Sequence, residues 1–307
     1  RLYKRETYKK SKERIGERKM KKSKLAKVLT VSLAALMVFG LASCGGGSGK
    51  VSDKDITVIS REEGSGTRDA FTELTGVLQD DVDKTVDTAE ISNSTSVVTQ
   101  SVAGNDAAIG YISLGSLDDT VKAVKVDGVE ATVDNIKSGD YKIQRPFNIV
   151  TKGEVKELPA DFIKFIMSKD GQKIIEDEGY ISVNDNAEAY KASGLEGSIT
   201  RAGSTSVSPV MEVLADKYKE LNSGVTIEIQ QTGSGAGIQS TTEGVCDIGM
   251  ASRELKDEET SQGLKSEEIA LDGIAVIVNK DNGAEDLSMD QIMKIFTGEI
   301  TSWADVK

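Results

Sequence analysis

Short β-rich runs alternate along this chain with segments whose apolar residues have helical spacing, and this alternation limits the fold more than any other feature. Helices are expected over residues 158–179 and 208–222, the second opened by Pro209. The pattern predicts an α/β fold with mostly parallel sheets. With 38% apolar residues, the 307-residue chain has room for one large or two medium domains. The β-rich runs occupy residues 56–60, 107–113, 147–151, 225–231, 246–252 and 274–279.

The amino-terminal part has the composition of a processing signal. Residues 20–43 form a basic stretch, an apolar run and the sequence Leu-Ala-Ser, directly before Cys44. The apolar run is too short to span a bilayer, so a bacterial lipoprotein signal peptide is expected, with cleavage before Cys44 and lipidation of its thiol. An ordinary cleaved secretory leader is the alternative. Residues 44–54 would then be a flexible tether, and residues 1–19 an upstream extension that is not part of the protein.

Charge is divided unevenly between this leader and the rest of the chain. Residues 1–43 carry 13 of the 38 Lys and Arg but only 3 of the 50 Asp and Glu. The remainder is therefore strongly acidic. Since such a body repels polyanions, no nucleic-acid partner is expected.

Residue types also limit the chemistry. The chain has no histidine, which excludes Ser-His-Asp triads and His-containing zinc sites. Cys44 and Cys246 are the two cysteines, and with Cys44 lipidated Cys246 is expected to be a small buried apolar residue. Glu62 and Glu63 are adjacent, so one ion-pair partner and one solvated charge are expected rather than an acid/base pair. We therefore predict no catalytic residues, no metal and no cofactor, and a protein that is not an enzyme.

Three places share one plan, in which a strand ends in a Gly/Ser/Thr loop from which a helix begins. They are "ISREEGSGTRDAF" (59–71), "TRAGSTSVSPVME" (200–212) and "QQTGSGAGIQSTTEG" (230–244). Glycine permits the tight turn, and amides and hydroxyls at the helix start donate hydrogen bonds to a small anion. One such loop is commonly only a helix cap, but three in one chain indicate an oxyanion site.

These loops, together with "IALDGIAVIVN" and "IFTGEITSWADV", resemble the phosphate-binding lipoproteins of Pst-type ABC transporters. The resemblance covers residues 55–307. It implies a type II periplasmic-binding-protein fold, in which two lobes of mostly parallel sheet flanked by helices are joined by a two-strand hinge. It further implies capture of inorganic phosphate between the lobes, delivery to permease subunits of an ABC transporter, and lipid anchoring on the outer face of the cytoplasmic membrane. Alternatives are a binding protein for sulfate or molybdate, or a structural or adhesive lipoprotein.

The resemblance also implies a set of ligand-binding residues, contributed by loops of both lobes. Glu63 would orient the arginine of the set. The implied phosphate ligands are Arg61, Ser65, Gly66, Thr67, Thr205, Ser206, Ser234 and Ser252.

One position departs from the family pattern. Where much of the family has an aspartate that accepts the hydrogen of protonated phosphate, this chain has Arg253. Either another carboxylate replaces it, with Glu254 and Asp272 as candidates, or discrimination is looser, or the anion differs. Arg253 itself is expected to be either a second cationic contact or a solvated charge.

The order of the segments also departs from the usual family order and predicts a circular permutation. A misassembled or truncated gene is the alternative. Lobe A is expected over residues 55–145 and 276–307, and lobe B over residues 146–275. Within lobe B, residues 184–198 would be the linker between the old ends.

Overall fold

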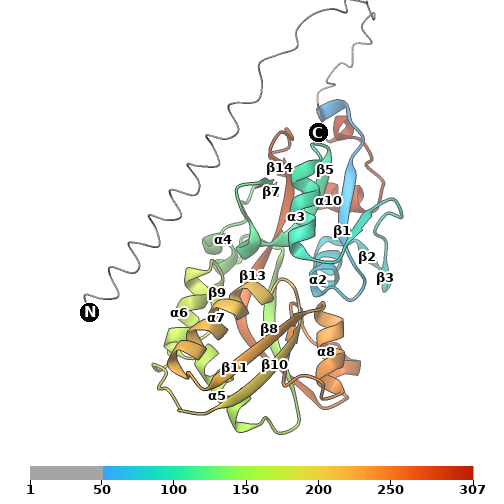
Figure 1. Ribbon diagram of the computed structural model, residues 1–307. Coiled ribbons are helices and arrows are strands. Elements are labelled where there is room, and N and C mark those ends of the chain that lie inside the picture. Colours follow the sequence, from blue (N-terminus) through green and yellow to red (C-terminus); the bar gives the residue numbers. More distant parts are fainter. Residues whose placement is uncertain (1–50, 307) are drawn as a thin grey trace, which may run out of the picture. The chain divides into compact units, whose positions relative to one another are not determined.

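The computed structural model describes residues 51–306, and the folded part has two α/β lobes (Figure 1). The predicted signal peptide and Cys44 lie outside the described residues. Lobe A denotes residues 51–143 with 274–306, and lobe B denotes residues 147–270. No described helix is long and apolar enough to cross a membrane.

Lobe A is built on a sheet in which β4, β1 and β5 run parallel, and β13 (Leu264–Asn279) pairs antiparallel with β5 and β6. Its core contains Phe71, whose ring stacks on Tyr111 and meets Phe296 edge-on. The elements are η1 (Val51–Asp53), β1 (Thr57–Arg61), α2 (Gly66–Thr75), β2 (Leu78–Gln79), β3 (Val82–Asp83), β4 (Glu90–Ser92), α3 (Thr95–Gly104), β5 (Ala108–Ser113), η2 (Leu114–Ser116), β6 (Val121–Ala123), β7 (Lys125–Val126), α4 (Val133–Lys137), β14 (Asp286–Leu287), α10 (Met289–Phe296) and η3 (Trp303–Asp305).

Lobe B contains the other end of the same ten-stranded sheet and has its own core. Strands β11, β10 and β12 run parallel, and β8 (Gln144–Lys152) pairs antiparallel with β12. Phe147, Phe162 and Tyr218 belong to a core cluster that is separate from that of lobe A. The elements are α5 (Glu157–Ile166), α6 (Lys169–Asp177), β9 (Ile181–Ser182), β10 (Gly197–Gly203), α7 (Ser208–Leu221), β11 (Val225–Gln231), α8 (Ser234–Thr242), β12 (Ile248–Ala251) and α9 (Asp257–Thr260).

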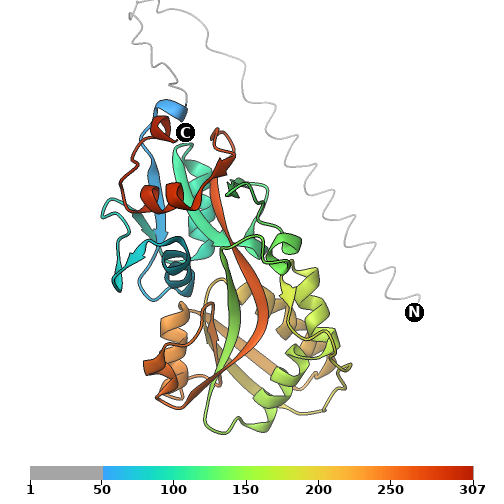
Figure 2. The ribbon, with the colours of Figure 1, turned by 180° about the vertical axis from the view of Figure 1, so that it is seen from behind.

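Two long strands pass between the lobes. Strands β8 (Gln144–Lys152) and β13 (Leu264–Asn279) run antiparallel beside each other from one lobe to the other (Figure 2). Arg145 and Asp272 face each other in register and form an ion pair of 3.1 Å, with both side chains buried. Two α/β lobes on a two-strand hinge are the predicted fold.

The helix predicted over residues 158–179 is two helices, α5 and α6. The first helix ends at Ile166, and Ser168 caps the second, because its hydroxyl accepts a hydrogen bond from the Gly171 amide at 3.2 Å. Apolar residues of both helices pack on the lobe B core, so the apolar periodicity alone does not reveal the break.

An irregular segment, residues 183–196, connects β9 to β10 and is fastened to lobe B. The last two residues of the predicted linker belong to β10. Asp161 of α5 accepts hydrogen bonds from the hydroxyls of Tyr190 and Ser193 in this segment and of Tyr218 in α7. Burial raises the pKa of Asp161, but these three hydrogen bonds outweigh it and hold the pKa below its usual value. The segment therefore depends on the charged carboxylate.

We expect Asp161→Asn to lower the free energy of unfolding by about 1 kcal/mol at pH 7, because a neutral amide accepts hydroxyl hydrogen bonds less strongly. Since the folded-state pKa is depressed, this stabilisation is complete above the ordinary value of 3.8 and is lost as the pH falls through the folded-state pKa. Urea unfolding at pH 7 and pH 3 measures it, with Asp177→Asn as an exposed control on α6. Equal stability of the wild type and Asp161→Asn at pH 7 would contradict the assignment.

The two ends of the described chain meet on lobe A. The Trp303 amide donates to the Lys54 carbonyl at 3.1 Å, and the Ile56 amide donates to the Thr301 carbonyl at 2.7 Å. The first and last described elements, η1 and η3, are therefore neighbours.

Candidate anion-binding site

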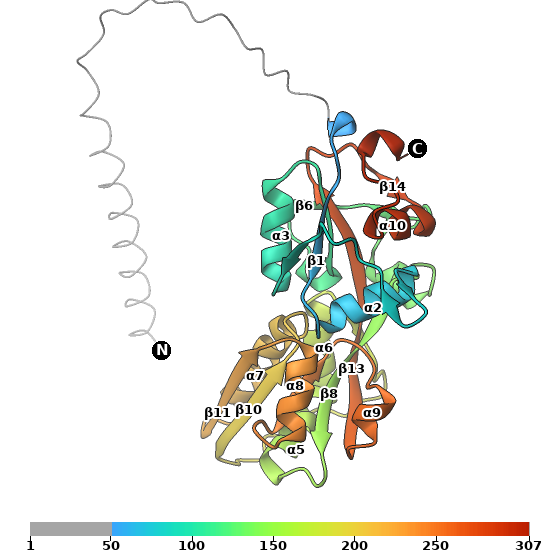
Figure 3. The ribbon, with the colours of Figure 1, turned by 90° about the vertical axis from the view of Figure 1, so that its right-hand side faces the viewer.

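The first predicted loop joins β1 to α2. Gly64 has a positive φ of 81°, and the Ser65 hydroxyl caps α2 by accepting a hydrogen bond from the Arg68 amide at 3.4 Å. Ser65 and Thr67 are buried, with 1% exposure each. The amino-terminal end of α2, which carries the positive end of the helix dipole, is therefore buried, and α2 lies next to α8 of lobe B (Figure 3).

Two loops of lobe B converge on Ser252, which follows β12. Before α7, the Ser204 hydroxyl accepts from the Ser206 amide at 3.2 Å and donates to the Ser252 hydroxyl at 3.0 Å. At the start of α8, the Ser234 hydroxyl accepts from the Ser252 amide at 3.1 Å. All four serines are nearly inaccessible to solvent, and the hydroxyls of Ser204, Ser234 and Ser252 form one buried hydrogen-bonded cluster.

Hydroxyl and backbone groups of the two lobes are in direct contact. Thr67 of lobe A and Ser206 of lobe B form a hydroxyl–hydroxyl hydrogen bond of 2.8 Å. Beside it, the Gly235 amide at the start of α8 donates to the Gly64 carbonyl at 2.9 Å. The described conformation is therefore closed at this point.

Gly66 of lobe A lies against Ser234 and Ser252 of the serine cluster. A Cβ atom on Gly66 would lie 2.5 Å from the Ser234 hydroxyl oxygen and 2.8 Å from that of Ser252. Because these distances are below a van der Waals contact, only glycine fits here without a shift of the surroundings.

Thr95 at the start of α3 belongs to the candidate site but is not among the residues predicted from the sequence. Its hydroxyl is 3.3 Å from that of Thr205 and 3.2 Å from that of Ser206, both in lobe B. The available signal was the Ser-Asn-Ser-Thr run at residues 92–95, where Ser94 caps α3. That run lacks glycine and follows a strand of only three residues, which made it less conspicuous than the other three loops.

Arg61 is buried at the end of β1, with 2% exposure. Its guanidinium makes two hydrogen bonds of 2.7 Å to the Glu62 carboxylate and one of 3.4 Å to the Thr95 hydroxyl. The prediction that Glu63 orients Arg61 is wrong in this structure, because Glu62 holds the guanidinium and Glu63 is exposed. The expected pattern of one ion-pair partner and one solvated charge is present, with Glu62 as the partner and Glu63 as the exposed charge.

Arg253 is buried and fully engaged with carboxylates, so it is not a solvated charge. It makes two hydrogen bonds of 2.8 Å to Glu259 and one of 2.9 Å to Asp69 across the cleft. Burial lowers the pKa of Arg253, but Glu259 and Asp69 together raise it above its usual value. A guanidinium held in this way has little capacity left for a ligand.

Neither carboxylate nominated as a substitute acceptor lies in the cluster. Glu254 is exposed. Asp272 accepts hydrogen bonds from Arg145 at 3.1 Å and from Ser113 at 2.9 Å in the hinge. Burial raises the pKa of Asp272 to about 6, while Arg145 and Ser113 act in the opposite direction. Asp272 is therefore a hinge residue. Its closeness to Ser252 and Arg253 along the sequence could not distinguish it from a residue of the cleft.

The eight predicted ligand residues lie together and are all buried, although they come from four separate loops. They are Arg61, Ser65, Gly66, Thr67, Thr205, Ser206, Ser234 and Ser252. Within residues 51–306, no group of Cys, Asp and Glu side chains is arranged to hold a metal ion.

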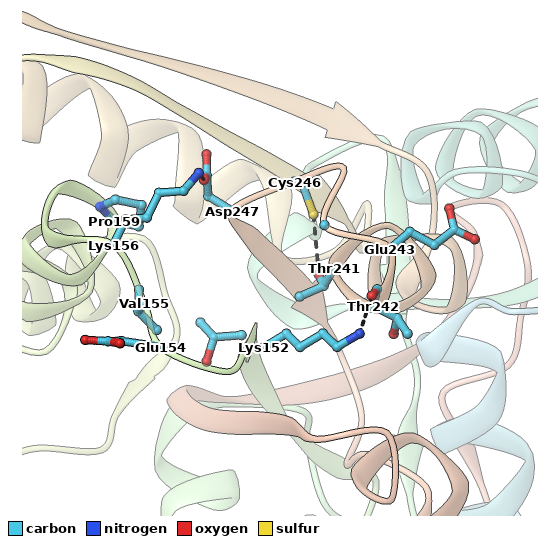
Figure 4. Close-up of a pocket in the computed structure, with 12 residues that line it drawn as sticks. Lys152, Glu154, Val155, Lys156, Pro159, Thr241, Thr242, Glu243, Cys246 and Asp247 are labelled. Carbon is cyan, nitrogen blue, oxygen red and sulfur yellow. Dashed lines mark hydrogen bonds and ion pairs between the residues drawn. The ribbon is translucent and has the colours of Figure 1, made fainter.

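A separate hollow of about 350 Å³ lies in lobe B between the end of β8 and the end of α8 (Figure 4). Its two lysines are already engaged, since Lys152 donates to the Thr242 carbonyl at 2.6 Å and Lys156 pairs with Asp247 at 2.9 Å. Cys246 is buried there, 3.3 Å from the Thr241 hydroxyl. Each lysine of this hollow therefore already has a partner within lobe B.

Two α/β lobes on a two-strand hinge, with helix starts, hydroxyls and an arginine meeting between them, define the class of two-lobed solute-binding proteins. A family model described as a PBP superfamily domain matches residues 41–170 and 188–307. The chain belongs to this superfamily and, within it, to the PstS family of phosphate-binding proteins, as the following relatives show.

Phosphate-binding protein PstS 2 of Streptococcus agalactiae serotype V is 52% identical over 294 residues, which are 94% of this chain and 99% of the relative. Phosphate-binding protein PstS 2 of Streptococcus pneumoniae serotype 4 is 48% identical over 92% of this chain and all of the relative. A crystal structure of a phosphate-binding protein of a phosphate ABC transporter from S. pneumoniae TIGR4 has 49% identity and a TM-score of 0.68. The match covers 83% of this chain and 100% of the chain in the crystal structure.

The order of the segments is shared with these relatives, since the match to the two PstS 2 proteins runs along nearly their whole length. The match to PstS of Bacillus subtilis is partial, with 36% identity over 36% of this chain and 37% of the relative.

Proposed function

We propose that this protein binds inorganic phosphate between its two lobes and delivers it to the permease of an ABC transporter. The observation that carries the proposal is the meeting of hydroxyl and amide donors from both lobes beside Arg61, as in the 2.8 Å contact between Thr67 and Ser206. The protein belongs to a family whose members are named phosphate-binding proteins, and this supports phosphate as the ligand.

The proposed ligands are the eight residues named above, together with Thr95. Phosphate oxygens would take the place of the hydroxyl–hydroxyl contacts between the lobes, and each new hydrogen bond to the anion would be charge-assisted. Closure of the lobes removes water and strengthens these bonds, and the closed form is the one presented to the permease. The part outside residues 1–43 is strongly acidic, but exposed charges beyond a Debye length of about 8 Å are screened, so the enclosed donors dominate.

Calorimetric titration of the purified protein with phosphate, arsenate, sulfate and molybdate tests the proposal. We expect tight binding of phosphate and much weaker binding of sulfate. A preference for sulfate or molybdate would instead favour the second candidate, a carrier of another tetrahedral oxyanion. That candidate is motivated by Arg253, which stands where much of the family has a carboxylate acceptor. No binding of any of the four anions would contradict both.

We also propose that Cys44 carries a lipid that holds the protein on the outer face of the cytoplasmic membrane. The support is the signal-like composition of residues 20–43 and the relatives' role in ABC transporters. Mass spectrometry of the membrane fraction should find the diacylated cysteine at the amino terminus of the protein. An unmodified Cys44 in that fraction would refute the anchor.

We further propose that the chain is a circular permutation of the more usual PstS order, with residues 183–196 as the junction. Two observations support this proposal. The ends of the described chain are neighbours, as the hydrogen bond between Lys54 and Trp303 shows, and PstS of Bacillus subtilis matches only 36% of this chain. A rearrangement confined to one gene would not be shared with streptococcal relatives. A variant that begins at Gly197, with residue 307 joined to residue 51, should fold and bind phosphate with unchanged affinity. Failure of this variant to fold would contradict the proposal.

A further inference from the structure

Arg253 connects the two lobes at the rim of the candidate site. Its Nε donates to the Asp69 carboxylate at 2.9 Å, and Asp69 is in the first turn of α2 in lobe A. Its two terminal nitrogens bind the Glu259 carboxylate of α9, in the same lobe as Arg253. The guanidinium is therefore fixed on lobe B and reaches across to lobe A.

The lobe B half of this arrangement is rigid. The Glu259 carboxylate also accepts a hydrogen bond from the Lys256 amide at 2.8 Å, and Arg253 donates to the Glu254 carbonyl at 2.8 Å. The Asn148 side chain of β8 donates to the Arg253 carbonyl at 3.0 Å. All these contacts are within lobe B, so they persist when the lobes move apart, whereas the contact with Asp69 does not.

Both ends of the cleft-spanning pair are attached to the candidate site. Arg253 directly follows Ser252 of the serine cluster. Asp69 comes two residues after Thr67, and its amide donates to the Ser65 carbonyl at 2.9 Å. A movement that brings the two sets of ligand residues together therefore also brings Asp69 to Arg253. The pair also lines a hollow of about 490 Å³, together with residues of α2 and of the hinge strand β8.

We propose that Arg253 and Asp69 form a closure latch, an ion pair that is made when the lobes close and that slows release of the bound anion. This role rests on the proposed function. Arg253 is then a positioning residue rather than an anion ligand. The latch also explains why an arginine stands directly after Ser252 of the site without binding the anion itself. The side chains of Arg253 and Asp69 are 9% and 29% exposed, so the pair is only partly screened by solvent.

The test measures phosphate release by stopped flow and closure by the distance between spin labels. We expect Asp69→Asn to raise the dissociation rate about fivefold with little change in the association rate. In the Arg253→Gln background the same substitution should have almost no effect, because its partner is gone. Asp290→Asn removes one exposed acidic charge from the same lobe, away from the cleft, and should match the wild type.

Spin labels at the exposed positions Lys84 in lobe A and Lys217 in lobe B report closure without any ligand. We expect Asp69→Asn to shift the distance distribution toward longer values, both with and without phosphate. An unchanged distribution together with an unchanged release rate would overturn the latch, even if Asp69→Asn lowered the thermal stability. If the wild type bound no phosphate, the proposed function would fail, and the ligand-free distances would still decide the latch.

Discussion

Gly66→Ala will weaken phosphate binding at least a hundredfold, about 2.7 kcal/mol, without unfolding the protein. The added methyl group would lie 2.5 Å from the Ser234 hydroxyl oxygen and 2.8 Å from that of Ser252, so it occupies the space between the lobes. Alanine is otherwise favoured over glycine in a helix, and Gly66 is in the first turn of α2. Calorimetry with phosphate and thermal unfolding of the ligand-free protein measure the two effects.

Gly104→Ala is the matched control, because Gly104 is also a helical glycine and a Cβ atom there meets nothing within 4 Å. This control should bind phosphate like the wild type. If Gly66→Ala also retained wild-type affinity, the closed contact between α2 and the serine cluster would not be part of the binding site.

Arg61→Met is expected to have a comparable effect, again at least a hundredfold, about 2.7 kcal/mol. The substitution removes the buried cation of the site and leaves the Glu62 carboxylate without its two hydrogen bonds of 2.7 Å. An uncompensated carboxylate at that position repels the anion in addition to the lost attraction. Calorimetry measures the affinity, and circular dichroism checks the fold.

The double variant Arg61→Met with Glu62→Gln separates these two contributions. It should recover part of the lost affinity for phosphate. The neutral glutamine no longer repels the anion, whereas the attraction by Arg61 is still missing. Wild-type affinity of Arg61→Met, or no difference between the single and double variants, would exclude the assigned roles of Arg61 and Glu62.

Local signals in the sequence predicted the fold and most of the candidate site. Glycines, hydroxyl residues and helix starts lie within a few residues of one another, so the loops around Ser65, Thr205 and Ser234 can be recognised one at a time. Ser168 could not be recognised as a helix break, because the apolar residues on both sides of it pack on one core.

Pairings between distant residues could not be predicted in this way. Asp69 and Arg253 are 184 positions apart, so their contact depends on how the lobes are placed. The choice between Glu62 and Glu63 depends on the direction in which the chain turns after β1, which adjacent letters do not reveal. Asp272 was a candidate acceptor because it is near the cleft segments in the sequence. Its place opposite Arg145 follows from the register of β8 and β13, which the sequence does not reveal.

The connection of the lobes through β8 and β13 has a consequence for synthesis of the chain. Every buried residue of the lobe B core lies in one stretch, from Phe147 to Ala270, whereas the lobe A core also needs Ile292, Phe296 and Trp303 near the end. Because domains fold as units while the ribosome adds residues, lobe B should fold first although lobe A is begun first. Ribosome-bound chains stalled with Asp272 just outside the exit tunnel should already resist protease in lobe B, while residues 51–143 are still cleaved.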